Sequence, residues 1–527
     1  FNPAALKTNL HSLRLGGLLI IDEGAYTPRN YKKAGYEGDP LEDEELAKYQ
    51  LLKIDITART HEAVDAMGAS KKQGDRAKNF WALGLVYWMF GRDRQETIDW
   101  IKTKFAKIEE VAAANTGALN AGHAYGETME IGADLAAKPQ QAALPNGTYR
   151  AITGIDAMSL GLAAAATCSG MKLAYCSYPI TPATGLLHGL AKFQAKGVIT
   201  FQAEDEIAAV AAAIGASFGG ALGITGSSGP GIALKAEAMG LAVGAELPLI
   251  VVNVQRAGPS TGLPTKAEQA DLLMAMYGRH GEAPCAILAP ATPAECFQVM
   301  LDAADIALTY MTPVIVLADG YIANAAEPWQ IPDVDSLPDL KPKFHTDPEG
   351  FHPFLRDEKT LARAWAIPGT PGMQHRIGGI ERGANNGHIS YEPENHQQMT
   401  NFRAEKIAGI ANDRPAITPD LGPSSGKLAI VGWGSTYGAI HGAVNELNKD
   451  GKDVAHIHVR QMSPLPRGFE ELLRSYDHIL VPEMNMGQLV KLIRAEYLID
   501  AKGLNQVTGK PFKVGKIKQT ALDMLEN

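Results

Sequence analysis

The middle of the chain alternates short apolar runs with helical patterns of hydrophobic residues. The apolar runs are continuous enough to be buried strands, and in chain order they are KLAYCSY, VITFQAE, ALGITG, PLIVVNVQ, CAILAP and TPVIVLAD. The helical patterns between them are DEIAAVAAAIGASFGG, IALKAEAMGLAVGAEL and TPAECFQVMLDAADIALTYM. Apolar strands that alternate with helices predict a parallel sheet covered on both faces. Ligands of such sheets bind beyond the carboxyl ends of the strands.

Residues 427–527 repeat this alternation on a smaller scale. The pattern there predicts three strands, KLAIVGWG, VAHIHVRQM and HILVPEMN, and three helices, GAIHGAVNELNKDG, FEELLRSY and GQLVKLIRAEYLIDAKG. We therefore predict a second, smaller parallel α/β domain.

Residues 328–426 separate these two regions and lack their periodicity. The segment is rich in Pro, Gly, His and charged residues, with one short helical pattern near MTNFRAEKIAGI. Irregular segments of this length are uncommon inside compact domains. We predict an extended, ordered linker that packs on a neighbouring surface.

Residues 1–147 contain the strand-like runs GGLLIID and LLKIDIT, a polar insertion at 25–49, and helical patterns that include NFWALGLVYWMFG. These are too few strands for a complete α/β domain. Because the sequence opens with Phe1 inside a helical segment, we expect further residues before it. The turn-rich break AAKPQQAALPNGTYR ends this region. The predicted domains are 1–147, 148–327, 328–426 and 427–527.

Composition limits the classes of partner. The chain has 527 residues, 46% hydrophobic and 20% charged, with a net charge of -9. That balance argues against a nucleic-acid surface, which needs a dense Lys/Arg patch. The apolar runs are shorter than the roughly 20 residues of a membrane span, and no signal peptide opens the sequence. The four cysteines have no zinc-ligand spacing, so we expect no metal site, and thiols in a reducing cytoplasm.

The stretch SYPITPATG follows the strand KLAYC directly, at a carboxyl strand end. Pro179 and Pro182 stiffen the loop and hold the Thr181 hydroxyl in place, where it could bind a carboxylate or keto oxygen. The alternative is a rigid turn before a helix capped by Thr181 or Thr184. Taken alone, these residues favour the turn.

Two or three carboxylates open the Ala-rich helix in FQAEDEIAAVAAAIGAS. Acidic residues are favoured at a helix N-terminus, which is a sufficient structural explanation. Glu206, however, is followed by ten small or apolar residues through Ala216. A carboxylate on so apolar a helix is expected to be partly buried, which suits it to sharing a proton with a heterocycle nitrogen.

Two glycine-rich stretches also join strands to helices. TGSSGPGIALKAE could cradle a phosphate, but it lacks the Lys-Ser/Thr of a P-loop, and a tight turn is the alternative. GWGSTYG could be interpreted as a dinucleotide-binding motif. The next strand, HIHVRQM, ends without the acidic residue that holds a ribose, so we reject NAD binding.

The loop NVQRAGPSTGLPTKAEQADL follows another predicted strand. It concentrates cationic and hydroxyl donors without matching carboxylates, namely Arg256, Ser260, Thr261, Thr265 and Lys266. We favour an anion-binding loop over a solvated surface loop, which is the alternative.

Together these motifs resemble the 2-oxoacid:ferredoxin oxidoreductases, specifically an α subunit of the 2-oxoglutarate type with a γ-type domain fused at its N-terminus. The resemblance is carried by YPITP, EDEIAAV, GSSGPGIALKAEAMGLAVGAELPLIVVNVQRAGPSTGLPTKAEQADL, YGRHGEAP, RIGGIE with SYEPENHQQM, and VPEMNMGQL. It covers essentially the whole chain. It implies a multidomain α/β protein: a pyrimidine-type thiamine-diphosphate domain, a transketolase C-terminal-like domain and an incomplete γ-type domain.

The resemblance implies thiamine-diphosphate-dependent oxidative decarboxylation of 2-oxoglutarate to succinyl-CoA, with electrons passed to ferredoxin. Glu206 resembles the glutamate that hydrogen-bonds N1′ of the coenzyme's aminopyrimidine. By the same resemblance Gly229 belongs to the cofactor site, and the substrate contacts are Tyr178, Thr181, Arg256, Thr261 and Lys266. Arg256 with Thr261 resembles the carboxylate-binding pair, and Lys266 and Arg279 are weaker candidates for the distal carboxylate of the substrate.

Family members hold the diphosphate and magnesium through a GDG…N motif and ligate a cluster through cysteines, and neither pattern occurs here. The resemblance therefore implies a β subunit that carries the diphosphate, magnesium and four-iron four-sulfur cluster sites, in an (αβ)2 assembly. Pyruvate or a branched-chain 2-oxoacid is the alternative substrate. A non-catalytic structural subunit, or a transketolase-like or dehydrogenase-type thiamine enzyme, is the alternative of another class.

Overall fold

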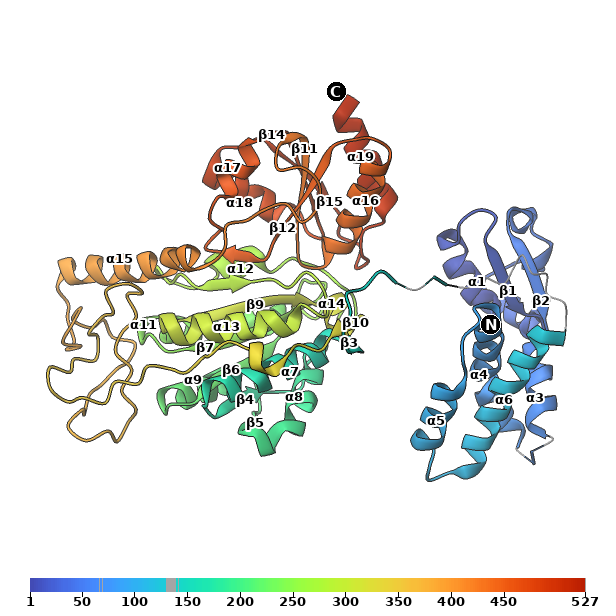
Figure 1. Ribbon diagram of the computed structural model, residues 1–527, viewed down its shortest axis with the longest axis horizontal. Helices are drawn as coiled ribbons and strands as arrows, with labels where there is room; N and C mark the ends of the chain where they lie inside the picture. Colours follow the sequence, from blue (N-terminus) through green and yellow to red (C-terminus); the bar gives the residue numbers. More distant parts are fainter. Residues whose placement is uncertain (66, 69, 129–138, 141, 527) are drawn as a thin grey trace. The chain divides into compact units, whose positions relative to one another are not determined.

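The computed structural model describes residues 1–65, 67–68, 70–128, 139–140 and 142–526. The chain divides into two compact units, Phe1–Pro145 and Asn146–Asn527 (Figure 1). Part of the predicted turn-rich break, residues 136–138 and 141, lies outside the described residues. No helix in the described part of the chain is long and apolar enough to cross a membrane.

The first unit packs helices against a small parallel sheet, in which β1 (Leu18–Asp22) pairs with β2 (Gln50–Ile54). Its helices are α1 (Pro3–Asn9), α2 (Pro28–Ala34), α3 (Ile56–Asp65), α4 (Lys71–Met89), α5 (Gln95–Lys104) and α6 (Glu109–Thr128). Helices α4 and α6 cross very closely, since a Cβ at Gly122 would lie 1.8 Å from the Trp81 carbonyl oxygen. The polar insertion at 25–49 forms α2 and the 3-10 turns η3 (Pro40–Glu42) and η4 (Glu44–Lys48).

The second unit is built on a seven-stranded sheet of order β13-β8-β9-β7-β6-β4-β5. Neighbouring strands are parallel except β13, which runs antiparallel to β8, so the predicted parallel α/β sheet is confirmed. The strands are β4 (Leu173–Ser177), β5 (Val198–Gln202), β6 (Leu222–Ser227), β7 (Leu249–Gln255), β8 (Ala286–Leu288), β9 (Pro313–Asp319) and β13 (Gln461–Ser463).

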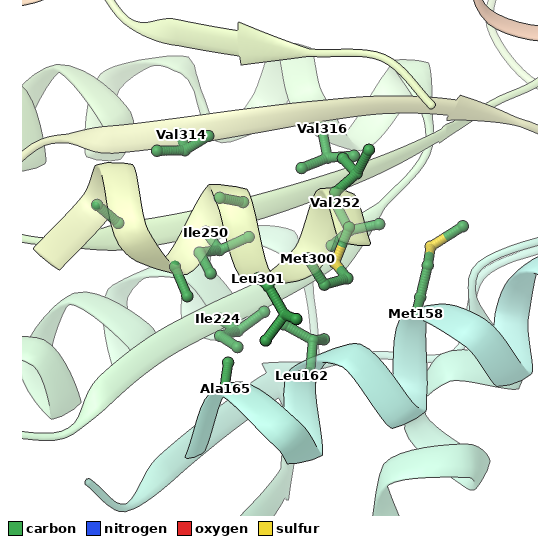
Figure 2. Close-up of a cluster of buried hydrophobic side chains, with 14 of the residues drawn as sticks. Met158, Leu162, Ala165, Ile224, Ile250, Val252, Met300, Leu301, Val314 and Val316 are labelled. Carbon is green, nitrogen blue, oxygen red and sulfur yellow. The ribbon is translucent and has the colours of Figure 1, made fainter. Parts of the chain in front are cut away.

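Both faces of this sheet are covered, which explains the continuous apolar strands. Figure 2 shows one face, where Leu162 of α7 (Gly154–Ser169) and Leu301 of α13 (Cys296–Tyr310) pack toward Ile250 and its neighbours. Helix α8 (Thr184–Leu190) joins them. The other face is covered by α9 (Glu206–Phe218), α10 (Gly229–Leu234), α11 (Ala236–Gly244) and α12 (Leu272–Tyr277). Burying each aliphatic side chain of these strands contributes about 1.5–3 kcal/mol.

The smaller sheet has the parallel order β12-β11-β14-β15. Its strands are β11 (Gly426–Trp433), β12 (Val454–Val459), β14 (Tyr476–Glu483) and β15 (Ala501–Asn505). Helices α16 (Tyr437–Lys449) and α19 (Val514–Glu526) cover one face, and α17 (Phe469–Arg474) and α18 (Gln488–Tyr497) the other. The predicted second α/β domain is thereby confirmed as a fold.

Three predicted elements differ from those in the structure. The single strand VAHIHVRQM is two strands, because Arg460 between them binds Asp420 and Glu295 and the chain crosses from β12 into the larger sheet as β13. The helix IALKAEAMGLAVGAEL is interrupted at Lys235. The last helix ends at Tyr497, because Leu498 adopts a left-handed backbone (φ 55°) and the following residues form β15.

The segment that follows the larger sheet packs on it, as its length predicts. Helix α14 (Gly320–Asn324) leads into β10 (Ala326–Gln330), which pairs with β3 (Tyr149–Thr153). Later come η7 (Val334–Ser336), α15 (Pro393–Gly409) and η8 (Ile410–Asp413). Arg356 and Lys406 both bind the buried Glu246 carboxylate, and Arg363 donates to the Glu246 carbonyl oxygen. These contacts fix the linker to the sheet domain.

Candidate active site

The predicted site residues gather at the carboxyl edge of the seven-stranded sheet. Strands β4, β6 and β7 end side by side there, and the loops that follow them contain Tyr178, Gly229 and Arg256. Glu206 enters from the start of α9, just after the edge strand β5. Residues 23 to 78 positions apart in the sequence are thereby placed at one edge, because parallel strands end in register.

Tyr178, Ser227 and Glu206 converge on Gly231. The Tyr178 hydroxyl lies 2.8 Å from the Ser227 hydroxyl oxygen. A Cβ added at Gly231 would lie 2.1 Å from Ser227 Oγ, 2.3 Å from Tyr178 Oη and 2.9 Å from Glu206 Cγ. Only glycine permits this approach. Burial raises the pKa of Tyr178, the Ser227 hydrogen bond opposes the rise and the Glu206 carboxylate adds to it. The phenol therefore keeps its proton.

Glu206 is the first residue of α9 and is half-buried. The helix is capped by the preceding residue, since Asp205 accepts a hydrogen bond from the backbone N–H of Ala208 (2.8 Å). Asp205 thus does the capping, and the Glu206 side chain is left for another purpose. Among the described residues, no cation forms an ion pair with the Glu206 carboxylate.

Arg256 connects the loop after β7 to the loop after β4 by a hydrogen bond. Its Nη1 donates to the Thr181 carbonyl oxygen at 2.7 Å, while its buried Nε has no hydrogen-bond partner in the described part of the chain. The Thr181 side chain is exposed. The predicted cap of α8 is wrong for both threonines: the helix begins at Thr184 after the N-cap Ala183, and the Thr184 hydroxyl bonds the backbone of Ile180.

The remaining predicted residues of the Arg256 loop, Thr261 and Lys266, are exposed. A bridge between Ala257 and Leu263 shapes the loop. The stem of Lys266 packs beside Gly509 of the smaller domain, where a Cβ would lie 2.8 Å from Lys266 Cβ. The structure thus brings Tyr178, Thr181, Glu206, Gly229 and Arg256 together. Thr261 and Lys266 lie exposed on the Arg256 loop.

Gly229 begins a short helix beside a buried polar group. A Cβ at Gly229 would lie 2.9 Å from Asp271 Oδ2, and that oxygen accepts from Asn253 Nδ2 at 3.0 Å. Burial raises the pKa of Asp271, and the Asn253 hydrogen bond opposes the rise. Ser228 Oγ and Asn253 Oδ1 are buried and have no hydrogen-bond partner among the residues that the structure describes. Unpartnered polar atoms at strand ends are what a polar ligand would satisfy.

Arg279 does not belong to the site. Its guanidinium donates to three backbone carbonyl oxygens, those of Ala275, Ala283 and Met276, at 2.7, 2.8 and 3.0 Å. The side chain is buried and its donors are committed to closing the turn after α12. The suggestion that Arg279 binds a distal carboxylate is therefore wrong.

Lys235 was not singled out by the sequence. Its side chain is fully buried, and its Nζ donates to the Glu206 carbonyl oxygen and to Thr225 Oγ1, both at 3.0 Å. The available signal was a single lysine inside an apolar helical pattern.

In the described part of the chain, no group of three or more His, Cys, Asp or Glu residues could hold a metal ion. All four cysteines are free, and Cys176, Cys285 and Cys296 are buried.

Sequence comparison identifies the family. The chain is 49% identical over 525 residues to the 2-oxoglutarate oxidoreductase subunit KorA of Mycobacterium tuberculosis, an alignment that covers 99% of this chain and 80% of that protein. The chain belongs to the 2-oxoacid:ferredoxin oxidoreductase family. The resemblance seen in YPITP and its companion motifs is therefore confirmed, and the chain is part of an oxidoreductase.

Other members of the family agree. Residues 166–392 match the family described as "Pyruvate flavodoxin/ferredoxin oxidoreductase, thiamine diP-bdg", and residues 1–125 match "Pyruvate ferredoxin/flavodoxin oxidoreductase". The 2-oxoglutarate synthase subunit KorA of Archaeoglobus fulgidus is 32% identical over 336 residues, 63% of this chain and 88% of that protein. The solved 2-oxoglutarate:ferredoxin oxidoreductase of Magnetococcus marinus, with 2-oxoglutarate, coenzyme A and succinyl-CoA bound, is 30% identical with a TM-score of 0.86, covering 100% of this chain and 87% of its own.

Proposed function

We propose that this chain is the α subunit of a 2-oxoglutarate:ferredoxin oxidoreductase, in which 2-oxoglutarate is oxidatively decarboxylated to succinyl-CoA and electrons pass to ferredoxin. The observation that carries the proposal is the convergence of Tyr178, Glu206 and Arg256 at one sheet edge. The names of the relatives support the substrate, and the Magnetococcus marinus structure holds 2-oxoglutarate, coenzyme A and succinyl-CoA.

The chain's residues fit thiamine diphosphate at this edge. The half-buried Glu206 carboxylate has no ion pair among the described residues, and the unpartnered Ser228 and Asn253 oxygens lie at the neighbouring strand ends. When bound, the coenzyme supplies a carbon nucleophile for the keto group and holds the electron pair left by decarboxylation. Glu206 would hold the proton shared with N1′ of the aminopyrimidine, and Gly229 would let the coenzyme approach the backbone.

Arg256, Thr181 and Tyr178 would bind and orient the oxoacid. Arg256 supplies a guanidinium whose Nε lacks a partner, and guanidinium groups suit carboxylates. Its hydrogen bond to the Thr181 carbonyl oxygen holds the backbone of Thr181 in place. Tyr178, which keeps its proton, remains a donor. Thr261 on the same loop is proposed to join Arg256 in binding the carboxylate, and Lys266 is proposed for the distal carboxylate of 2-oxoglutarate.

We propose that a β subunit completes the site and supplies the diphosphate, magnesium and four-iron four-sulfur cluster sites, in an (αβ)2 assembly. Two relatives in Aeropyrum pernix are named subunit alpha, which supports a partner. Apolar side chains close to Glu206 in sequence are about half exposed, at Ile199, Phe201 and Ile207. Exposed apolar groups clustered beside a site favour an interface. Free cysteines fit a reducing compartment, and we place the complex in the cytoplasm.

The predicted domain division remains part of this proposal. Residues 1–147 would be the γ-type domain that takes part in coenzyme A binding, 148–327 the pyrimidine domain, 328–426 the linker and 427–527 the transketolase C-terminal-like domain. The family matches at 1–125 and 166–392 support the first two assignments.

The decisive test is Glu206→Gln in the co-expressed complex. Loss of the shared proton should lower 2-oxoglutarate-dependent ferredoxin reduction by roughly 100-fold or more. The matched control is Glu204→Gln, because Glu204 is an exposed carboxylate two residues away. Unchanged turnover in Glu206→Gln would favour a non-catalytic structural subunit.

The substrate is tested separately, by comparing 2-oxoglutarate with pyruvate and a branched-chain 2-oxoacid on the same preparation. A kcat/KM that favours pyruvate by tenfold, about 1.4 kcal/mol at the transition state, would overturn the 2-oxoglutarate assignment. Reduction of NAD without ferredoxin would indicate a dehydrogenase-type thiamine enzyme instead.

A further inference from the structure

Lys235 is a fully buried lysine at the candidate site, with 0% of its surface exposed. Lysine is almost never fully buried unless its charge is paired. Lys406, the other deeply buried lysine discussed above, obeys this rule, since its Nζ lies 2.5 Å from the Glu246 carboxylate. In the described part of the chain Lys235 has no such ion pair. Its burial therefore requires another explanation.

The ammonium group of Lys235 contacts three elements of the site. Its Nζ donates to the carbonyl oxygen of Glu206 at 3.0 Å and to Thr225 Oγ1 at 3.0 Å, and it lies 5.2 Å from the centre of the Tyr178 ring. It thus links the first turn of α9, the strand β6 and the loop after β4. These three segments present Glu206, Ser227 and Tyr178.

Lys235 lies at the junction of two short helices. Helix α10 ends at Leu234 and α11 begins at Ala236, and Lys235 between them has a ψ of -5°. Leu234 is 55% exposed, whereas Lys235 is fully enclosed. Lys235 keeps right-handed backbone angles, and helical hydrogen bonds to Gly231 and from Met239 continue across the junction. A leucine or methionine at this enclosed position would fill the space without desolvating a charge.

The charges around Lys235 keep it protonated near neutral pH. Burial lowers its pKa to about 8, while the carboxylates of Glu206 and Asp205 and the Cys176 thiol oppose the fall. The charged and titratable groups that face it are thus Glu206 and Asp205 on α9, Cys176 on β4 and the Tyr178 ring. As an ammonium, Lys235 can donate to the Glu206 carbonyl, the Thr225 hydroxyl and the aromatic face at once.

We propose that Lys235 is the positioning residue for Glu206: through the Glu206 carbonyl it fixes the first turn of α9, and through the Tyr178 ring it fixes the facing wall, so that the carboxylate is held at one point for the coenzyme. This inference rests on the proposed function of Glu206. A residue of this kind acts by geometry, and a displacement of about 1 Å in a catalytic group lowers turnover by roughly 100-fold.

The test uses the co-expressed complex with Lys235→Met, which keeps the side-chain length and removes the three donors. We expect kcat for 2-oxoglutarate to fall roughly 10- to 100-fold, with KM changed by less than about threefold because the substitution leaves Arg256 and Thr181 in place. Thiamine diphosphate affinity, measured by calorimetry, should fall in the same variant. Amide hydrogen exchange in residues 207–210 should accelerate, while that of α13 should not.

Lys406→Met is the matched control, because it also empties a buried ammonium position but lies on Glu246 in the linker contact. It should lower the unfolding temperature and leave kcat per folded enzyme unchanged. Thr225→Val is the milder second variant, which removes one acceptor and keeps the fold. It should lower kcat in the same direction, by roughly 3- to 10-fold, the equivalent of one hydrogen bond.

A lower unfolding temperature in Lys235→Met and Thr225→Val with unchanged kcat, coenzyme affinity and α9 exchange would overturn the inference. Failure of the proposed function would look different. In that case Glu206→Gln would keep its turnover, whereas exchange in residues 207–210 would still report whether Lys235 holds the start of α9.

Discussion

Two glutamates of the sheet domain, Glu206 and Glu246, lie in opposite kinds of surroundings. Glu246 precedes β7 and is fully enclosed, with Arg356 at 2.7 and 3.0 Å and Lys406 at 2.5 Å. Glu206 lies at the carboxyl edge and is half-buried without an ion pair among the described residues. Each has a lysine nearby, but Lys235 binds the Glu206 backbone and leaves the carboxylate free.

The two glutamates therefore differ in role: Glu246 anchors the linker to the sheet domain, and Glu206 is the proposed reactive carboxylate. Burial alone would raise the pKa of Glu246, but Lys406 and Arg356 overcome that effect and lower it to about 2. A carboxylate so fully compensated stays ionised and cannot exchange protons near neutral pH. Glu206 lacks such compensation, and its position is set by contacts to its main chain. Chemistry is left to the carboxylate that has no ion pair among the described residues.

The largest effect should come from breaking the anchor. Glu246→Ala leaves two buried cations without an anion, so the free energy of unfolding should fall by about 3–5 kcal/mol. Glu206→Ala removes no ion pair and should change it by less than about 1 kcal/mol. Urea unfolding of the full chain compares the two. Equal losses of unfolding free energy in the two variants would contradict the difference between Glu246 and Glu206.

The same anchor should appear in the pH dependence of stability. Because the folded pKa of Glu246 is about 2, below its ordinary value of 4.5, its stabilisation is complete above pH 4.5 and is lost as the pH falls toward 2. Thermal unfolding from pH 6 to pH 3 measures the loss. Glu246→Gln should flatten this part of the profile, and a profile identical to that of the natural chain would contradict the assignment.

A substitution at Arg256 should affect the kinetics more than the stability, in contrast to a substitution at Glu246. Arg256→Lys cannot reproduce the fork with which the guanidinium is proposed to bind the substrate carboxylate. A charged hydrogen bond to that carboxylate contributes about 1.5–3 kcal/mol, so kcat/KM for 2-oxoglutarate should fall roughly 10- to 150-fold. The hydrogen bond to the Thr181 carbonyl oxygen is exposed, so its loss should lower the free energy of unfolding by about 1 kcal/mol or less. If Arg256→Lys lowered the free energy of unfolding but left kcat/KM unchanged, Arg256 would be a structural residue like Glu246.

Tyr178→Phe should have the smallest effect. It removes the hydrogen bond between Tyr178 and Ser227 and keeps the ring over Lys235. We expect a stability loss of about 0.5–1.5 kcal/mol. Ser227→Ala is the matched control, since it removes the same bond from the other side. If Tyr178→Phe lowers turnover far more than Ser227→Ala, the hydroxyl contacts the substrate rather than only Ser227.

The features that depend on local pattern could be predicted from the sequence. The strands of the large sheet are continuous apolar runs because both faces are covered, and strand ends mark where Tyr178, Gly229 and Arg256 must meet. The features that could not be predicted depend on contacts between distant segments. Lys235 resembled one more helical residue, and Glu246 a helix end, because their partners lie in other elements. Arg279 resembled a free cation, although backbone carbonyls of its own turn bind it.

Strand β13 has a consequence for motion. It belongs by sequence to the smaller domain, but it pairs with β8 as the outermost strand of the seven-stranded sheet, and buried side chains of both sheets form one continuous hydrophobic cluster. Strand pairing and a shared hydrophobic core therefore hold the smaller domain against the larger one, so it cannot move as a lid over the carboxyl edge. A chain cut before β11 would expose the β8 edge as a template for pairing with other molecules.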